Sequence, residues 1–393
     1  MDPSFSSRVL GRIARNPLTK ARARLEARDT SIIDLTVSNP TQVALEYPSA
    51  LRCQLDTEHY SEALGFGSAR EAVASYLRRH DLDVDSRQVV LTASTSEAYG
   101  LLFKLLCDPG DEVAIPRPSY PLLEYLTRLE SVVSVPYALE FHARWEIDVA
   151  ALRSCVTSRT RAVVMVNPNN PTGSFVSSDE LRDVSALCRQ YGLALIVDEV
   201  FGLYPLTASG RGPSVLDEDQ GVLTFVLGGL SKAVGLPGLK LGWVVLAGPD
   251  APVATALERL ELICDTYLSV AMPVQLALGD LLDHGREVTR RIAGRVKQNH
   301  ACLARTVSEN PTADLLPVEG GWYAVTRVPA TVSEERLVLD LLERAHVLVY
   351  PGYFFDFPKE AFLVISLLPE PHLFESAAQR VLSIAAGSES SAS

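Results

Sequence analysis

The stretch Gly228-Gly229-Leu230-Ser231-Lys232-Ala233 lies between two apolar runs and contains a single lysine. The apolar run over 223–230 has the length and composition of a buried strand, and a glycine-spaced segment follows at 235–242. Small residues around the lysine allow a ligand to approach the backbone closely. A solvated surface charge is the simplest interpretation of a lone lysine, but an amine at the end of a buried strand also suits attack on a carbonyl group. Lys232 is therefore a candidate nucleophile.

The 393-residue chain has the composition of a folded globular protein, with 47% hydrophobic and 21% charged residues. This length is sufficient for two domains. The 36 basic and 48 acidic side chains give a net charge of −12, which argues against a nucleic-acid or anionic-membrane partner. No apolar run approaches the roughly 20 residues of a transmembrane helix. The six cysteines are scattered without a C-x-x-C pair, which favours reduced thiols in a cytoplasmic protein over disulfides or a zinc site.

The N-terminal segment is rich in arginine between Arg8 and Arg28 but lacks the apolar core of a secretory signal. A helical arm that packs on the body or on a partner subunit fits this composition, and so does an arginine-rich targeting peptide. The sequence leaves both interpretations open.

Apolar runs alternate with polar loops and helical patterns through the first two thirds of the chain. Strands are expected at 88–91, 112–115, 161–166 and 193–197. A polar loop and a helical pattern follow each of the first three, and the fourth ends at Asp198 and Glu199. Such units imply right-handed βαβ crossovers, so the fold class is α/β with a mostly parallel central sheet flanked by helices. Ligands bind beyond the carboxyl ends of such strands, where the loops gather.

Residues 251–307 show long helical periodicity, and strands and helices resume from Gly320 onwards. This pattern predicts helices that link two domains, the second of them small and α+β. The expected organisation is an N-terminal arm over 1–45, a large domain over 46–285 and a small C-terminal domain over 286–393, whose end at 387–393 has a disordered composition.

The predicted loops carry side chains that could hold an aromatic, phosphorylated cofactor. Asp198 ends a buried apolar run, so it needs a cation or hydrogen bonds, either in a structural salt bridge or against a protonated pyridine nitrogen. Asn170 is either a turn residue or a donor to a ring oxygen. Tyr120 is either packed or stacked on a heteroaromatic ring. The remaining candidates either cap a helix or bind phosphate at its N-terminus; they are Ser94, Thr95 and Ser96.

The order and spacing of three motifs resemble those of a known family. The motifs are Asn-Pro-Asn-Asn-Pro-Thr-Gly at 167–173, Asp198-Glu199, and Leu-Ser-Lys at 230–232. With them the chain resembles the class I/II aminotransferases, which are fold type I pyridoxal phosphate (PLP) enzymes related to aspartate aminotransferase, from about Ile33 to Leu382. The resemblance implies a PLP cofactor and a homodimer with composite active sites.

The resemblance also implies a role for each matching residue. Lys232 matches the lysine that forms a Schiff base with the cofactor and shuttles the proton, and Asp198 matches the partner of the pyridine nitrogen. Asn170 matches the ring-oxygen donor, and Tyr120 the ring-stacking residue. The matches to phosphate contacts are Ser94, Thr95, Ser96 and Ser231, together with Tyr60, which reaches the phosphate of the neighbouring subunit. Asn39 falls in a substrate-side loop.

Three positions near the cofactor depart from the family. Phe201 replaces a tyrosine that donates to the ring oxygen, and losing that donor should raise the pKa of the Schiff base. Lys240 replaces an arginine near the phosphate, which keeps the charge and loses the bidentate fork. Gly229 replaces the first serine of Ser-x-Ser-Lys and so removes one side-chain hydroxyl that contacts the phosphate.

A fourth departure concerns the substrate. Aligning 362–366 with the last strand of the family places Val364 where an arginine usually binds the α-carboxylate, and no Arg or Lys occurs between Lys359 and Arg380. A valine cannot make the bidentate pair. Either another cation takes over, with Arg327 as a candidate, or the substrate is not held by an α-carboxylate.

These observations favour a ping-pong aminotransferase that moves an amino group between an amino acid or amine and a 2-oxo acid. Because Val364 replaces the arginine, a PLP-dependent lyase or decarboxylase acting on an atypical amine is the alternative. A third hypothesis is a catalytically silent regulator that binds PLP. Two observations argue against a fused DNA-binding domain: the chain is acidic, and only about 45 residues precede the expected fold. The lysine itself argues for catalysis.

Overall fold

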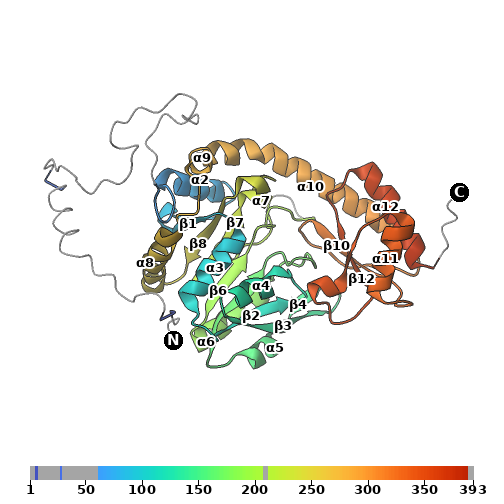
Figure 1. Ribbon diagram of the computed structural model, residues 1–393, viewed down its shortest axis with the longest axis horizontal. Helices are drawn as coiled ribbons and strands as arrows, with labels where there is room; N and C mark the ends of the chain where they lie inside the picture. The colour runs from blue at the N-terminus through green and yellow to red at the C-terminus, as the bar shows by residue number, and fades with distance from the viewer. Residues whose placement is uncertain (1–4, 8–26, 29–60, 207–210, 388–393) are drawn as a thin grey trace.

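The computed structural model describes residues 5–7, 27–28, 61–206 and 211–387, and the structural statements below concern these residues (Figure 1). The core of the large part of the molecule is an eight-stranded sheet in the order β1-β8-β7-β6-β5-β2-β3-β4. In chain order the strands are β1 (Val89–Thr92), β2 (Glu112–Arg117), β3 (Val133–Phe141), β4 (Trp145–Ile147), β5 (Thr160–Val166), β6 (Ala194–Asp198), β7 (Thr224–Gly229) and β8 (Gly242–Ala247).

Neighbouring strands from β7 through β6, β5 and β2 to β3 are parallel, whereas β8 and β4 run antiparallel to their neighbours. This arrangement confirms the predicted α/β fold with a mostly parallel sheet. Strand β3 is long and extends to Phe141, because its second half pairs with β4.

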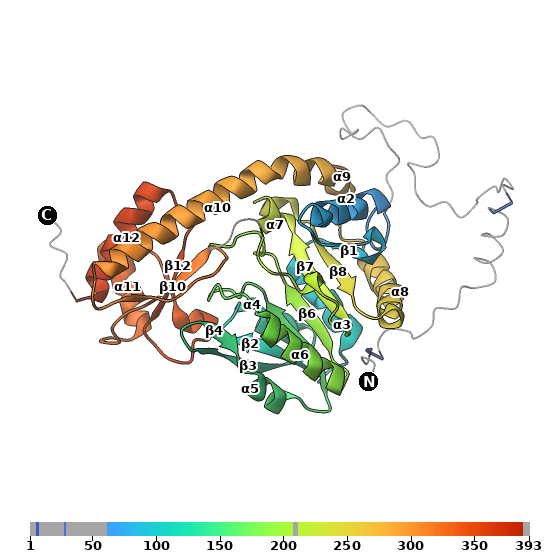
Figure 2. The same cartoon turned by 180° about the vertical axis from the view of Figure 1, so that it is seen from behind.

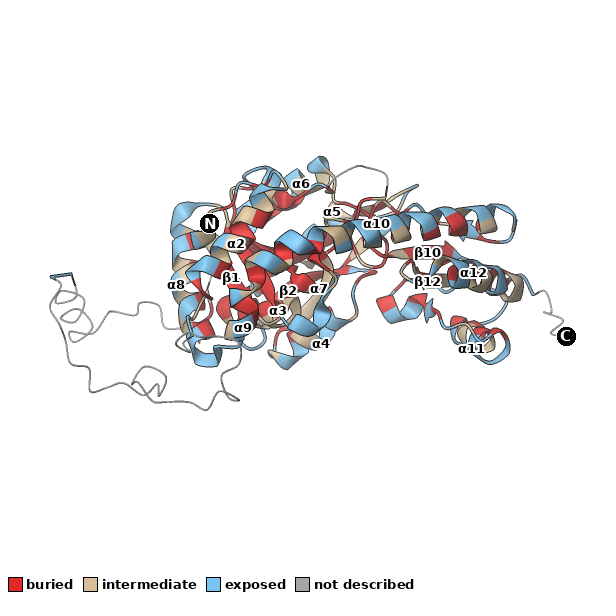
Figure 3. Ribbon diagram, turned by 90° about the horizontal axis from the view of Figure 1, so that it is seen from above, coloured by how far each residue is buried: buried red, intermediate tan, exposed pale blue. Residues whose placement is uncertain are grey.

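Helices cover both faces of this sheet (Figures 1 and 2). One face carries α3 (Thr95–Leu106), α4 (Leu122–Leu129) and α8 (Asp250–Tyr267), and the other carries α2 (Gly67–Arg78), α5 (Val149–Cys155) and α6 (Ser178–Tyr191). With both faces buried, the central strands are apolar at nearly every position. Buried residues accordingly fill the middle of the large part in Figure 3.

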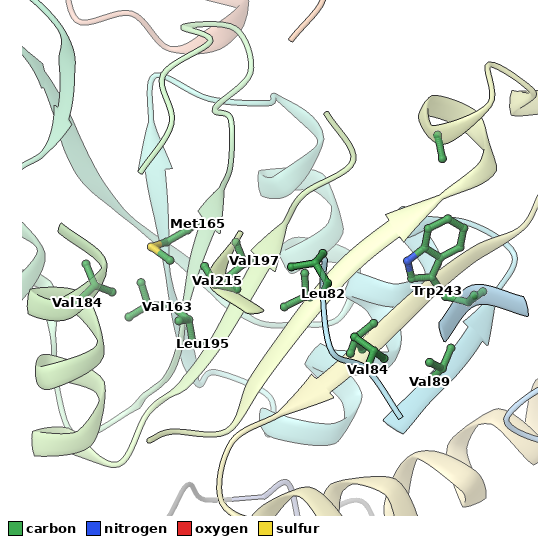
Figure 4. Close-up of a cluster of buried hydrophobic side chains, with 14 of the residues drawn as sticks. Leu82, Val84, Val89, Val163, Met165, Val184, Leu195, Val197, Val215 and Trp243 are labelled. Atoms are coloured by element: carbon green, nitrogen blue, oxygen red, sulfur yellow. The ribbon is translucent and has the colours of Figure 1, made fainter. Parts of the chain in front are cut away.

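The alternation of side chains along β5 and β6 shows how each face is filled. Val163 and Met165 of β5 join Leu195 and Val197 of β6 in one buried cluster, while the residues between them join the cluster on the opposite face. Figure 4 shows the four labelled side chains together with Val184 of α6. The sheet is therefore a rigid platform for the loops at its edge.

A long helix connects the sheet to a second, smaller one. After α9 (Met272–Leu276), α10 (Leu278–Ser308) extends for 31 residues from the large sheet toward the small one (Figure 1). The small antiparallel sheet has the order β11-β12-β10-β9. The predicted boundary at 285/286 falls inside the uninterrupted α10, so the exact division into domains stays a prediction.

The elements of the small part are β9 (Asp314–Leu315), β10 (Tyr323–Arg327), α11 (Glu334–Ala345), β11 (Tyr350–Pro351), β12 (Phe362–Ser366) and α12 (Pro371–Ala385). Strand β11 starts only at Tyr350. The backbone N–H of Val347 donates to the carbonyl of Leu341 in the preceding helix and is not free for strand pairing.

Membrane-spanning helices and metal-binding clusters are both absent from the described ranges. No described helix has the length and apolarity needed to cross a bilayer. No group of three or more His, Cys, Asp or Glu side chains is placed to hold a metal ion in this part of the chain.

Candidate active site

Four of the predicted residues meet at one edge of the large sheet. Tyr120 follows β2, Asn170 follows β5, Asp198 ends β6, and Lys232 lies in the short helix α7 (Leu230–Ala233) directly after β7. Since these strands are parallel neighbours in the order β7-β6-β5-β2, their carboxyl ends lie side by side.

A second group comes together around Gly242 at the start of β8. Gly242 pairs with Thr92 on one side and with Gly229 on the other, so the segment 94–96 and Ser231 both emerge beside it. A Cβ on Gly242 would lie 3.1 Å from the carbonyl carbon of Ser94, which is why a glycine is needed here. Lys240, two residues earlier, is exposed and has a left-handed backbone with φ of 51°.

The N-terminus of α3 is consistent with both interpretations of the 94–96 segment. The Ser94 hydroxyl accepts a hydrogen bond from the backbone N–H of Glu97 at 3.1 Å, so this serine caps the helix. The backbone N–H groups of Thr95 and Ser96 have no acceptor among the described residues. Two free donors at the positive end of a 12-residue helix suit an anion such as a phosphate.

Asp198 is a buried carboxylate with few partners. Its oxygens accept hydrogen bonds from the backbone N–H of Val200 at 3.1 Å and from the Tyr99 hydroxyl at 3.4 Å. No ion pair to this carboxylate is present in the described part of the chain. Burial raises its pKa to about 6, although the hydrogen bonds and the positive charge of Lys232 act in the opposite direction. The site thus contains a buried acid that lacks a close cation.

Lys232 is partly buried, and its charge acts on Asp198 without an ion pair between the two side chains. Burial lowers the pKa of its ammonium group, and the charge of Asp198 partly offsets that effect. The backbone carbonyl of Lys232 accepts a hydrogen bond from the Tyr204 hydroxyl, so Tyr204 fixes the main chain here. An amine with a lowered pKa is easier to deprotonate, as a nucleophile or base requires.

The asparagine-rich loop leaves one carboxamide free. Asn169 donates to the carbonyl of Pro118 at 3.1 Å and accepts from Ser119 at 3.0 Å, and Asn167 donates to Glu199 at 3.2 Å. In contrast, the side-chain oxygen of Asn170 is buried without a partner among the described residues. Because the two ends of a carboxamide interchange by rotation, this buried end can also present the N–H₂ group.

Glu199 stabilises the same loop from behind. Its carboxylate accepts hydrogen bonds from the Ser214 hydroxyl at 2.6 Å and the backbone N–H of Val215 at 2.8 Å, besides the bond from Asn167. Burial raises its pKa to about 7. In the sequence Glu199 belonged only to a motif; its place at the end of a fully apolar run was the available signal for this structural role.

Tyr120 lies at the open side of the site. Its side chain is 36% exposed, and burial of the remainder together with the charge of Asp198 raises the pKa of its hydroxyl. The charge of Asp198 also raises the pKa of Tyr99 on α3, after the larger effect of burial. Tyr99 contacts Asp198 directly and was not anticipated from the sequence, where it looks like a core residue of an apolar helix.

The structure gives less support to the residues predicted to contact the substrate or to come from the neighbouring subunit. Tyr60 and Asn39 lie outside the described residues. Arg327 donates to Asp314 at 2.6 Å at the exposed end of β10, so a carboxylate already engages its guanidinium group. Val364 is 1% exposed and pairs with Val325 of β10 and Tyr350 of β11, so these residues share one face of the small sheet. No described element supplies an arginine at that point of the face.

Four backbone hydrogen bonds attach the segment before the small sheet to the loops of the site, and one of them runs from Glu319 to Gly173 at 3.0 Å. Leu206 donates to Glu319 at 2.8 Å, Gly320 to Gly173 at 2.9 Å and Gly321 to Tyr204 at 2.9 Å. The segment 319–321 therefore lies directly against the loops that follow β5 and β6.

Replacing Gly320 with alanine is expected to destabilise the protein by about 1–3 kcal/mol. The new Cβ would lie 2.7 Å from the Phe175 ring and 3.1 Å from the Tyr204 carbonyl oxygen, so the segment would have to move. Urea unfolding measures the change. The control is Gly294→Ala in α10, where a Cβ meets nothing within 4 Å, and a gain of up to about 1 kcal/mol is expected. Equal behaviour of the two variants would contradict the close packing at Gly320.

Comparisons with known proteins point to one family. The family model for aminotransferase class I and II matches residues 32–381. An alanine aminotransferase of Mycobacterium tuberculosis is 30% identical over 385 residues, covering 93% of this chain and 88% of that protein. The glutamate-pyruvate aminotransferase AlaA of Escherichia coli is 26% identical and covers 90% of both chains. The structure of an alanine aminotransferase from Pyrococcus furiosus superposes with a TM-score of 0.78 at 26% identity, covering 97% of this chain and 99% of that one.

Proposed function

The chain belongs to the class I and II aminotransferases and is a transaminase, and we propose that it transfers amino groups between an amino acid and a 2-oxo acid through PLP held covalently by Lys232. When bound, PLP supplies an electron-accepting ring that stabilises negative charge at the Cα of the amino donor. The lyase or decarboxylase alternative is not favoured, because relatives matching most of the chain are named aminotransferases.

The proposal rests mainly on the burial of the Asp198 carboxylate. A fully buried carboxylate with no ion pair among the described residues costs stability unless a cation is supplied from outside the chain. A protonated pyridine nitrogen is such a cation. Asp198 would hold that proton in place, and its raised pKa would return to the ordinary range once the positive charge is beside it.

The other residues fit the remaining parts of PLP. The buried amide of Asn170 suits the ring oxygen, and the partly exposed ring of Tyr120 suits the face of the pyridine. The free N–H groups of Thr95 and Ser96 suit the phosphate, with Ser94, Ser231 and Lys240 nearby. Lys232 would take the proton from the Cα of the amino donor and deliver it to the C4′ carbon of the cofactor. A partly buried amine of lowered pKa can do this.

The homodimer is also a proposal. It rests on Tyr60, predicted to reach the phosphate of the neighbouring subunit, and on the exposed Leu236 and Leu239, which lie on the turn η4 (Pro237–Leu239) or beside it, close to Lys240. A cytoplasmic location, inferred from the scattered cysteines, has the same standing.

A single-turnover experiment tests the proposed reaction. L-alanine and L-glutamate are the first donors to try, because the relatives are named for alanine and for glutamate and pyruvate. Mixed with the PLP-loaded enzyme without an acceptor, a donor should shift the cofactor absorbance to the pyridoxamine form, and pyruvate should restore it. If no amino acid in a full screen produces this shift while the enzyme still releases CO₂ from an amino acid or ammonia from an amine, transamination is excluded.

A further inference from the structure

Two aromatic rings flank the amino group of Lys232. Its Nζ lies 4.6 Å from the ring centroid of Trp322 and 5.3 Å from that of Phe201. The two rings pack edge to face, with centroids 5.3 Å apart and an interplanar angle of 67°. Tyr204 also packs edge to face on Trp322, with ring centroids 5.0 Å apart and an interplanar angle of 71°. The amine therefore lies against the faces of a fixed aromatic cluster.

Trp322 belongs to the small part of the molecule and reaches Lys232 through a specific connection. It directly follows Gly320 and Gly321, whose N–H groups bond to the loops after β5 and β6. Its own carbonyl accepts the N–H of Leu367 at 2.8 Å, which ties it to the segment after β12. The position of the small sheet therefore determines where the indole ring lies relative to Lys232.

The ring of Trp322 is held by packing alone. It is 7% exposed, and its indole N–H has no acceptor among the described residues. A buried N–H without a partner costs free energy, so the ring occupies this place for its shape or its face. Attraction between an ammonium group and an aromatic face stabilises the charged form of the lysine and so opposes the effect of burial.

We propose that Trp322 is a positioning residue for Lys232: with Phe201 it forms a two-sided aromatic pocket that holds the amino group in place and stabilises its charged form. The function of the pocket rests on the proposed role of Lys232 as nucleophile and base. After Lys232 has accepted the Cα proton, the pocket holds the resulting ammonium beside the reacting atoms. Phe201, at the position where the resemblance expects a tyrosine, contributes only a ring to this pocket.

Within the described part of the chain, Asp198 is the charged group that acts on the amine. From β6, Asp198 raises the pKa of Lys232. The Tyr204 hydroxyl is engaged by the Lys232 carbonyl, and from α10 the neutral Thr289 donates to the carbonyl of Ala233. A substitution at Trp322 therefore changes the pKa of Lys232 in two ways: it removes the aromatic face beside the amine, and it alters how well water reaches the amine.

Trp322→Leu and Trp322→Phe separate these two effects, because both remove the indole and only leucine removes the aromatic face. In the full-length protein without cofactor, the rate at which an amine-specific reagent labels Lys232 is measured against pH by peptide mass spectrometry. The midpoint in Trp322→Leu is expected about 0.5–1 pH unit below that in Trp322→Phe. In the PLP-loaded enzyme, kcat should fall more than tenfold in Trp322→Leu with little change in KM, and Trp322→Phe should recover most of it.

Trp145→Leu is the matched control. Trp145 is 5% exposed, its indole N–H also lacks a partner among the described residues, and it packs edge to face on Phe357 at 5.6 Å. The Trp145→Leu variant should lose about as much stability as Trp322→Leu and should leave the labelling midpoint of Lys232 unchanged. If Trp322→Leu does not fold, Phe201→Leu removes the second ring and should lower the midpoint in the same direction.

Equal midpoints in Trp322→Leu and Trp322→Phe, or a higher midpoint in the leucine variant, would overturn the proposal. This readout does not depend on PLP. If the wild-type protein forms no covalent adduct with PLP at Lys232, the proposed function fails, whereas the labelling midpoints still show whether the aromatic pocket acts on the amine.

Discussion

Lys232→Ala is expected to lower the rate of the amino-donor half-reaction at least about a thousandfold. The side chain supplies both the covalent attachment and the proton transfer, and proton transfer by one positioned group alone contributes about 10²–10⁴ in rate. The variant keeps Asp198, Asn170 and the N-terminus of α3, so PLP should still bind, without its covalent bond. Stopped-flow absorbance with saturating alanine measures the loss.

Lys104→Ala is the control for this experiment. Lys104 is also partly buried and forms an ion pair with Glu130, but it lies within α3, away from the sheet edge. Its replacement should change stability and leave the half-reaction within about threefold of wild type. A Lys232→Ala protein that folds and retains more than a tenth of the wild-type rate would contradict the assignment of the nucleophile.

Asp198→Asn is expected to have opposite effects on stability and on activity. The pKa of Asp198 is raised from 3.8 to about 6 in the folded protein, so wild type loses stability as the pH rises through this interval. The difference corresponds to about 3 kcal/mol. The cofactor-free asparagine variant should therefore be more stable than wild type by up to this amount at pH 8, and the gain should shrink toward pH 5.

Activity should change in the other direction. Without the carboxylate, the protonated pyridine nitrogen has no counter-charge, and removing one such electrostatic group costs about 10²–10³ in rate. Such a gain in stability at the expense of activity is typical of a group kept for function. Urea unfolding of the cofactor-free protein at pH 5 and pH 8, together with the half-reaction rate, measures both effects.

Asp217→Asn provides a control of opposite sign. Burial acts to raise the pKa of Asp217, but the hydrogen bonds from Arg211 and Ser214 prevail and lower it. Its charged form thus stabilises the fold above its pKa, and the asparagine variant should lose stability at pH 8. If Asp198→Asn also lost stability at pH 8, the carboxylate would not be the unpaired buried charge described here.

The edge of the large sheet was predictable from the sequence because it depends on local patterns and on one topological rule. Apolar runs that end in Asp198, Asn167 and Gly229 are typical of parallel strands, and parallel strands bring their following loops to a common edge. The expectation that Lys232, Asp198, Asn170 and Tyr120 converge followed from this rule. The structure places all four there.

The contacts that cross between distant segments were not predictable in this way. Trp322 lies 90 positions after Lys232 in the chain, and nothing in its local pattern indicates that its ring lies against that amine. Tyr99 contacts Asp198 from a helix whose apolar sequence pattern indicates only a core helix. In each case the tertiary packing of two elements decides the contact, and single-sequence periodicity carries no information about it.

Reductive trapping at Lys232 tests the central claim most directly. The protein is loaded with PLP, reduced with borohydride and digested, and the peptides are analysed by mass spectrometry, with Lys232→Ala treated in parallel. The account predicts one stable phosphopyridoxyl adduct, located on Lys232 and missing from the variant. An adduct confined to another lysine, or no adduct in a folded wild-type protein that is saturated with PLP, would contradict it.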